Sequence, residues 1–165
     1  MAEERKAMEF ASIVREGLIT PGRLLASRSF LLDARGAEKD EDVRLALLLI
    51  FGAAGTLARY GLQGLVQQRT NAEYPSGTLV VNLLGCFLLG GIGEYGLRHL
   101  TLPPEWRVGM TVGFLGAFTT FSTFSWETVR LLEDGEWLRA GTYVLASVAG
   151  GIFAIVAGMR IAERL

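Results

Sequence analysis

The chain has 165 residues, half of them hydrophobic, and its 16 Lys and Arg residues nearly balance its 17 Asp and Glu residues. This even charge argues against a nucleic-acid partner and against a strongly acidic or basic soluble partner. The apolar composition indicates a membrane instead. Cys86 is the only cysteine, which excludes an internal disulfide and a thiolate metal site.

The first part of the chain, residues 1–43, is a polar N-terminal extension that is rich in both acidic and basic residues. It lacks the basic start, long apolar run and cleavage site of a secretory signal. Phe10, Ile13, Val14 and Leu18 recur at helical spacing, which favours an amphipathic surface helix as one interpretation. The preferred interpretation is a disordered tail or an extension from a wrongly assigned start codon.

The remainder, residues 44–165, contains segments long enough to cross the hydrocarbon core, which needs roughly 20 apolar residues per helix. The four predicted spans cover residues 45–66, 77–97, 108–129 and 138–161. Prolines precede the second and third spans, where helix starts are expected. Short connections make neighbouring spans antiparallel, so the sequence predicts an all-α integral membrane domain of four transmembrane helices.

The orientation of these spans is predicted from the Lys and Arg residues that flank them. One side has Arg44, Arg98, Arg107, Arg160 and Arg164, and the other has Arg69, Arg130 and Arg139. This bias is weak, so the domain is compatible with insertion in both orientations.

The third span is unusual because Phe118 to Ser125 reads FTTFSTFS, where a plain membrane helix would use Leu, Ile and Val. Glycine and β-branched residues make the stretch from Gly116 to Thr120 a weak helix. An interrupted helix here would free backbone carbonyls, which are cation ligands in other membrane proteins. The alternative is an intact helix whose hydroxyls bond to their own preceding turn.

Phe121 and Phe124 are three residues apart and share one helix face, and each ring has a positive edge. A small anion could rest against these edges while the hydroxyls of Ser122 and Thr123 donate hydrogen bonds to it. Ordinary core packing is the alternative explanation of such a pair.

Further polar residues in the spans allow either a functional or a structural role. The Asn82 amide could serve an ion pathway or hold two helices together. Arg59 could attract anions into a vestibule, or its head could reach the membrane interface. Glu127 would repel an anion, so we expect it to pair with an arginine or a backbone donor. Tyr143 and Ser147 are four apart and present a second hydroxyl face.

Three motifs together resemble the CrcB/Fluc family of fluoride channels. They are GAAGTLARY (residues 52–60), TLVVNLLGCFLLG (residues 78–90) and GFLGAFTTFSTFSWE (residues 113–127), and their order and spacing also match. The resemblance covers residues 45–162, all four spans. The pair Ala117-Phe118 departs from the smaller pair expected there and could alter the packing nearby.

The resemblance implies a fluoride-specific channel in the plasma membrane that passively exports fluoride and protects the cell from its toxicity. It implies an antiparallel, dual-topology homodimer with two pathways, each built from both subunits. Arg59 would lie near a vestibule, and the backbone carbonyls of Gly116 and Thr119 would hold a structural sodium ion that is not transported. The implied pore residues are Asn82, Phe121, Ser122, Thr123, Phe124, Tyr143 and Ser147.

Other functions stay open on the residues alone. A small dual-topology drug/proton exchanger needs a carboxylate in its first span, which here has Arg59 but no Asp or Glu. An intramembrane enzyme is disfavoured because the only histidine, His99, lies in a predicted loop and Cys86 has no basic partner. A non-conducting membrane scaffold is compatible with the sequence, because each candidate pore residue also has a packing interpretation.

Overall fold

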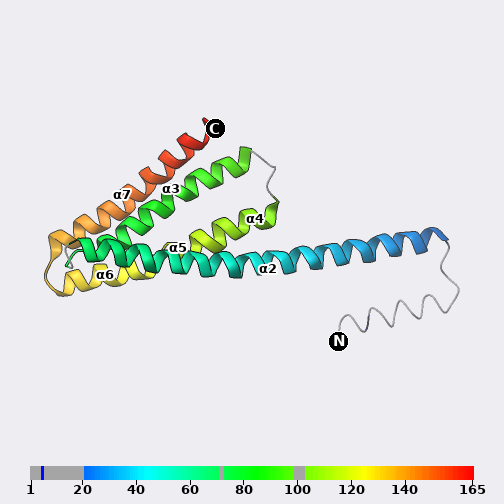
Figure 1. Ribbon diagram of the computed structural model, residues 1–165, viewed down its shortest axis with the longest axis horizontal. Coiled ribbons are helices and arrows are strands. Elements are labelled where there is room, and N and C mark those ends of the chain that lie inside the picture. The colour runs from blue at the N-terminus through cyan, green and yellow to red at the C-terminus, as the bar shows by residue number, and fades with distance from the viewer. Residues whose placement is uncertain (1–4, 6–20, 71–72, 99–102) are drawn as a thin grey trace. The chain divides into compact units, whose positions relative to one another are not determined.

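A computed structural model describes residues 5, 21–70, 73–98 and 103–165, and the elements described in it are helices (Figure 1). The chain divides into two units, Met1–Asp42 and Val43–Leu165. The second unit contains every residue that the sequence singles out as a candidate site. His99 lies outside the described residues.

The first long helix, α2, runs from Pro21 to Arg69. The sequence predicted a span over residues 45–66 after a disordered or mis-assigned leader, whereas residues 21–42 are helical in the structure. The predicted amphipathic pattern of the leader falls on residues 10–18, outside the described residues. The origin of the extension therefore stays a prediction.

Two further long helices, α3 (Ser76–Arg98) and α7 (Trp137–Ala162), match the predicted second and fourth spans within one residue at every end. Helix α3 begins directly after Pro75, because proline has no N–H to lose at a helix start. Before α7, Gly135 adopts φ +76° in the connecting turn, a conformation that favours glycine. At the end of α3, Arg98 donates a hydrogen bond from Nε to the Glu94 carboxylate, and this bond raises the pKa of Arg98.

The predicted third span is divided into four elements. They are α4 (Pro104–Val108), a π-helix η1 (Gly109–Leu115), α5 (Gly116–Phe118) and α6 (Phe121–Glu133). Between α5 and α6, Thr119 and Thr120 are extended, with ψ values of 159° and 114°. The predicted interruption is thus confirmed, and it lies at the C-terminal end of the stretch from Gly116 to Thr120 where the sequence predicted it.

Glycines let these helices approach closely. Helix α3 lies beside α7 (Figure 1), and a Cβ added to Gly158 of α7 would stand 2.1 Å from the Phe87 carbonyl oxygen of α3. In the same way, a Cβ on Gly55 of α2 would stand 2.2 Å from the Phe114 carbonyl oxygen of η1. Backbones this close gain dispersion energy that does not depend on water, which suits helix association in lipid.

Three described helical stretches are long and apolar enough to cross a membrane: Lys39–Arg69, Ser76–Gly96 and Trp137–Ala162. Large apolar side chains such as Phe153 (75% exposed) and Ile152 (63% exposed) project outward from α7. A surface of this kind is stable against lipid but not against water. The chain is therefore an all-α integral membrane protein.

Candidate functional site

The interruption between α5 and α6 is closed by a side chain from α3. The Thr120 amide donates to Oδ1 of Asn82 (2.8 Å), and Nδ2 of Asn82 donates to the Thr120 carbonyl (3.1 Å). Both backbone groups of Thr120, which is 7% exposed, are therefore satisfied by one amide. Asn82 does act as a helix contact, and its amide has a second N–H that this pair of bonds does not use.

Thr120 also caps α6. Its Oγ1 accepts from the Thr123 amide at 3.3 Å and donates to Oγ1 of Thr123 at 2.9 Å. A capping hydroxyl of this kind satisfies one of the unpaired amides in a first helical turn. Ser122 lies in the same turn with its Oγ 3.4 Å from that of Thr120. The predicted hydroxyls of Ser122 and Thr123 thus gather at the start of α6.

The two phenylalanines at the start of α6 lie against each other, as their spacing predicts. The ring centroids of Phe121 and Phe124 are 5.6 Å apart with an interplanar angle of 45°. The ring of Phe124 also contacts the ring of Tyr143 in α7, with centroids 5.2 Å apart and an interplanar angle of 53°. Phe121 is 79% exposed on the protomer, whereas Phe124 packs against the buried cluster of Leu131, Ala140 and Tyr143.

A cavity of about 320 Å³ lies beside the interruption. Six residues that the sequence predicts for the pore or the sodium site line it: Asn82, Gly116, Thr119, Phe121, Phe124 and Ser147. Its remaining walls are mainly apolar and small, including Gly85 and Cys86. The structure does not bring Ser122, Thr123 or Tyr143 to this lining. The cavity therefore combines two aromatic rings, one amide and the hydroxyl-bearing residues Ser147, Thr111, Thr119 and Thr120 in a mainly apolar surrounding.

Ser147 is the most informative polar group in this cavity. Its Oγ is buried and has no hydrogen-bond partner among the described residues. A buried hydroxyl without a partner costs about 1–3 kcal/mol, so natural proteins rarely keep one without a reason. A ligand or water that accepts its hydrogen bond would remove this cost.

Of the residues predicted for sodium, Gly116 begins α5 and Thr119 follows its last residue. In a continuous helix the Thr120 amide would bond to the Gly116 carbonyl, but here it bonds to Asn82 instead. Gly116 is exposed on the protomer. Gly85 of α3 makes room for Thr119, because a Cβ there would stand 2.2 Å from its Cγ2. Backbone oxygens released in this way suit a hard cation.

Phe118, where the resemblance led us to expect a smaller side chain, is buried behind this exposed side. It is 3% exposed and stacks on Phe114, with centroids 5.7 Å apart and an interplanar angle of 9°. Its ring also lies over Gly85 of α3. The extra ring therefore fills the helix interface behind the interruption.

A second polar group, centred on Glu127 of α6, differs from the sequence prediction. Its carboxylate accepts from Thr78 Oγ1 (2.8 Å) and from the Tyr143 hydroxyl (2.7 Å). Nε2 of Gln63 donates to Thr78 Oγ1 at 3.1 Å. The prediction that Glu127 pairs with an arginine or a backbone donor is wrong, because side-chain hydroxyls from α3 and α7 donate to its carboxylate instead. Sequence analysis missed the roles of Thr78 and Gln63.

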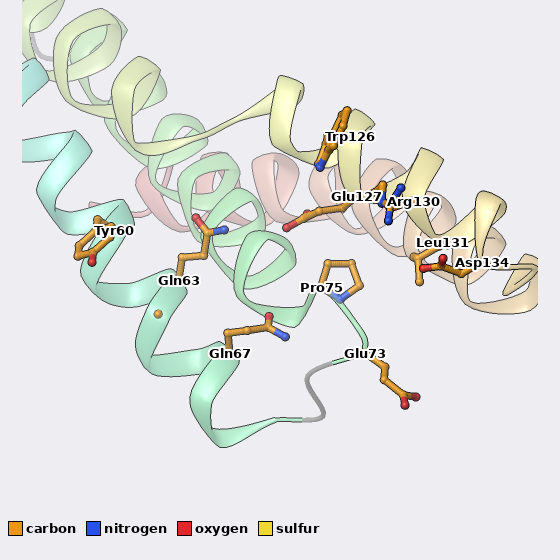
Figure 2. A pocket seen from close by; sticks show the side chains of 11 residues that line it. Tyr60, Gln63, Gln67, Glu73, Pro75, Trp126, Glu127, Arg130, Leu131 and Asp134 are labelled. Atoms are coloured by element: carbon orange, nitrogen blue, oxygen red, sulfur yellow. The ribbon is translucent and has the colours of Figure 1, made fainter.

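Gln63 and Glu127 of this group line a wider cavity of about 640 Å³, which lies between α2, the connection before α3, and α6. Figure 2 shows Gln63 and Glu127 directed toward the same space, with Tyr60 on the α2 side and Trp126 on the α6 side. Arg59, predicted for a vestibule, does not line this cavity, although its neighbour Tyr60 does. Arg59 is half-buried and has no ion pair among the described residues.

Comparison with known proteins relates this geometry to a family. The sequence model of the CrcB-like proteins, described with the words "Camphor Resistance (CrcB)", matches residues 46–159. A protein named fluoride-specific ion channel FluC from Geobacter metallireducens is 54% identical over 104 residues, which are 63% of this chain and 84% of the relative. Relatives of the same name from Geobacter sulfurreducens and Syntrophotalea carbinolica are 50% and 46% identical, over 72% and 74% of this chain and 95% and 100% of their own lengths.

Proposed function

We propose that this chain, which belongs to the CrcB-like protein family, forms a fluoride-specific channel that exports fluoride passively. The observation that carries the proposal is the cavity beside the interrupted helix. There Phe121, Phe124, Asn82 and Ser147 line one space, and the buried Ser147 hydroxyl has no hydrogen-bond partner among the described residues. These groups are donors or positive ring edges, and no carboxylate lines the cavity among the described residues.

Fluoride is small and holds its water tightly, so a pore must replace that water at each step of the passage. The second N–H of Asn82 and the O–H of Ser147 can donate directly to the anion. The edges of Phe121 and Phe124 carry partial positive charge and attract it more weakly. A series of weak sites lets the ion enter without trapping it, which conduction requires.

The proposed assembly is an antiparallel homodimer of four-span protomers, in which α4 to α6 act together as the interrupted third span. The weak Lys and Arg bias at the span ends supports insertion in both orientations. Gly116 and the ring of Phe121 are exposed on the protomer close to the interruption. A second copy is the natural cover for this surface, and it would close the cavity into a pathway.

A structural sodium ion at the centre of this dimer fits the donor set. Gly116 and Thr119 offer backbone oxygens beside the interruption, and the exposed position of Gly116 allows two copies to contribute equally. When bound, the ion would supply positive charge that holds the two interrupted helices together. His, Cys, Asp and Glu do not form a metal-binding cluster in the described part of the chain, so backbone oxygens are the donors that this site offers.

In a cell, hydrogen fluoride crosses the bilayer from acidic surroundings and releases fluoride in the more neutral cytoplasm. A leak selective for the anion in the plasma membrane would remove it, because an inside-negative potential of 100 mV is worth about 2.3 kcal/mol per charge. No coupled energy source is required. A passive fluoride leak of this kind would protect the cell from fluoride toxicity.

The decisive experiment is fluoride efflux from liposomes that contain the purified protein, followed with a fluoride electrode and compared with chloride efflux. We expect fluoride to leave much faster than from empty liposomes, and chloride to leave at the background rate. Equal fluoride efflux with and without protein would overturn the channel proposal. Fast efflux of both anions would overturn the fluoride specificity.

A further inference from the structure

A third cavity, of about 360 Å³, lies between the C-terminal part of α3 and the α4–η1 segment. Its lining consists of Ile92, Gly93, Gly96, Pro104, Arg107, Val108, Met110 and Thr111. Arg107 is the one charged residue in this lining among the residues that the structure describes. The cavity is therefore a mainly apolar chamber with a single cation in its wall.

Arg107 is built into this wall. Its side-chain stem lies on Gly96, where an added Cβ would stand 3.4 Å from Cδ, and its Nη1 donates to the Gly96 carbonyl at 3.3 Å. Its Nε is buried and has no hydrogen-bond partner among the described residues. A buried charge-bearing donor without a partner is costly, and an anion is the partner that would satisfy it best.

The acidic side chains nearby do not neutralise Arg107. Glu94 of α3 and Glu163 near the end of α7 pair with Arg98 and Arg160, at 2.6 Å and 3.0 Å. Glu105 lies in the same short helix as Arg107 but forms no ion pair with it in the described structure. The positive charge of Arg107 is thus available to the chamber.

The chamber adjoins the candidate pore cavity along one face of α3. Asn82, Cys86 and Leu89 line the pore cavity, and Gly93 and Gly96 line the chamber. These positions follow one another every three or four residues, so they form a single stripe along the helix.

Thr111 of η1 lines both spaces and joins them on the opposite wall. Its Oγ1 donates to the backbone carbonyl of Arg107 at 2.8 Å, so the residue shared by the two cavities contacts the residue that carries the positive charge. A π-helix at this position is notable, because such segments occur frequently at functional sites.

We infer that Arg107 forms the anion-collecting end of the fluoride pathway, and that fluoride moves between Arg107 and Asn82 along this stripe of α3. The inference rests on the proposed channel function and adds a site to it. The guanidinium raises the local fluoride concentration at the mouth, and the weakly polar chamber passes the still partly hydrated ion toward the donors. Arg107 exchanges the anion rapidly because its Nη1 already donates to the Gly96 carbonyl, which leaves only part of its donor set for the anion.

The first test compares Arg107→Gln with Arg107→Lys and Arg160→Gln in the liposome assay, at low and high ionic strength. Arg160 is the matched control, because its side chain is 72% exposed and it lines neither cavity. At low salt we expect R107Q to slow fluoride efflux by about tenfold, the lower end of electrostatic effects on association. R107K should stay within about twofold of the wild type, since it keeps the charge, and R160Q should match the wild type.

Salt separates an electrostatic role from a structural one. The difference between wild type and R107Q should shrink toward 1 M salt, where the screening length falls to about 3 Å. Equal losses in R107Q and R107K that do not depend on salt would assign Arg107 to packing and overturn the inference. Wild-type efflux in R107Q at low salt would overturn it as well. Absence of efflux in the wild type would instead defeat the channel function itself.

The second test places a larger side chain in the stripe of α3 that lines the chamber. Gly93 lines the chamber, and a Cβ at this position meets nothing within 4 Å, so Gly93→Leu has room for its first side-chain atom. Gly141 of α7 also has open space around it and lines neither cavity, which makes Gly141→Leu the control. We expect G93L to reduce efflux severalfold at every salt concentration and G141L to leave it unchanged. Full efflux in G93L would show that fluoride does not use this chamber.

Discussion

Asn82 and Thr120 form a two-bond bridge between α3 and the interruption in the third span, with one hydrogen bond of 2.8 Å and one of 3.1 Å. The bridge replaces the helical partners that the extended backbone at Thr120 has given up. Irregular backbone at membrane depth survives only where such partners exist. The interruption therefore depends on the amide of one side chain.

Asn82→Ala should destabilise the protein, because it leaves the amide and the carbonyl of buried Thr120 without partners. We expect a loss of about 1–3 kcal/mol, measured by thermal unfolding in detergent. Thr56→Ala is the control, since the exposed Thr56 hydroxyl donates to the Gly52 carbonyl of its own helix. If both variants unfold at the same temperature, the bridge does not hold the interruption.

Ser147→Ala separates stability from function by its sign. Removing a buried hydroxyl that has no partner among the described residues should leave the unfolding temperature unchanged or raise it, because the variant no longer bears the cost of about 1–3 kcal/mol of that hydroxyl. Fluoride efflux should fall, because one donor to the anion is lost. Thr142→Ala, on the exposed side of α7, should change neither quantity. Destabilisation by S147A would indicate that the hydroxyl serves packing instead.

How far the sequence could predict this structure is clear from the third span. Its interruption was predictable because Gly116, Thr119 and Thr120 are weak helix formers. They also lie in a segment of hydroxyl and aromatic side chains, where an ordinary membrane helix has Leu, Ile and Val. The hydrogen bonds from Asn82 to Thr120 could not be predicted from the sequence, because they join residues that lie 38 positions apart on different elements. Local propensity indicates where a helix is weak, and tertiary contacts decide which side chain repairs it.

The environment of Glu127 illustrates the same limit. The sequence indicated that a carboxylate in a span needs a partner, and it favoured arginine or a backbone donor. The partners are hydroxyls of Thr78 and Tyr143, 49 and 16 residues away. Only the packing of α3 and α7 beside α6 reveals them. The helical start of α2 at Pro21 also escaped prediction, since hydropathy detects only its apolar portion.

Phe121→Ile and Phe124→Ile should both reduce fluoride efflux but differ in stability. An aromatic contact is worth about 0.5–1.5 kcal/mol, so loss of a ring edge should lower anion occupancy by up to about tenfold. Phe121 is exposed on the protomer and contacts the ring of Phe124, so its variant should lose only about 0.5 kcal/mol if the dimer stays intact. Phe124 contacts Tyr143, and its variant should lose about 1–2 kcal/mol.

Phe153→Ile is the control for these ring substitutions, because Phe153 is 75% exposed on α7 and lines neither cavity along α3. It should change efflux little. Normal efflux in F121I would disprove the ring-edge mechanism but would leave the channel function standing. Comparable losses in F121I and F153I would attribute the effect to general changes in the membrane-facing surface.

A double-mutant cycle between Tyr143 and Glu127 tests the second polar group. Tyr143→Phe leaves one carboxylate oxygen without its donor, and hydrogen bonds to charged groups are worth about 1.5–3 kcal/mol. In an E127A background the Tyr143 hydroxyl has already lost its acceptor, so Y143F should cost much less there. We expect a coupling of at least about 1 kcal/mol from detergent unfolding. Y143F combined with F153I should be additive within about 0.5 kcal/mol, and additivity in the Glu127 cycle as well would mean that the 2.7 Å hydrogen bond does not contribute to folding.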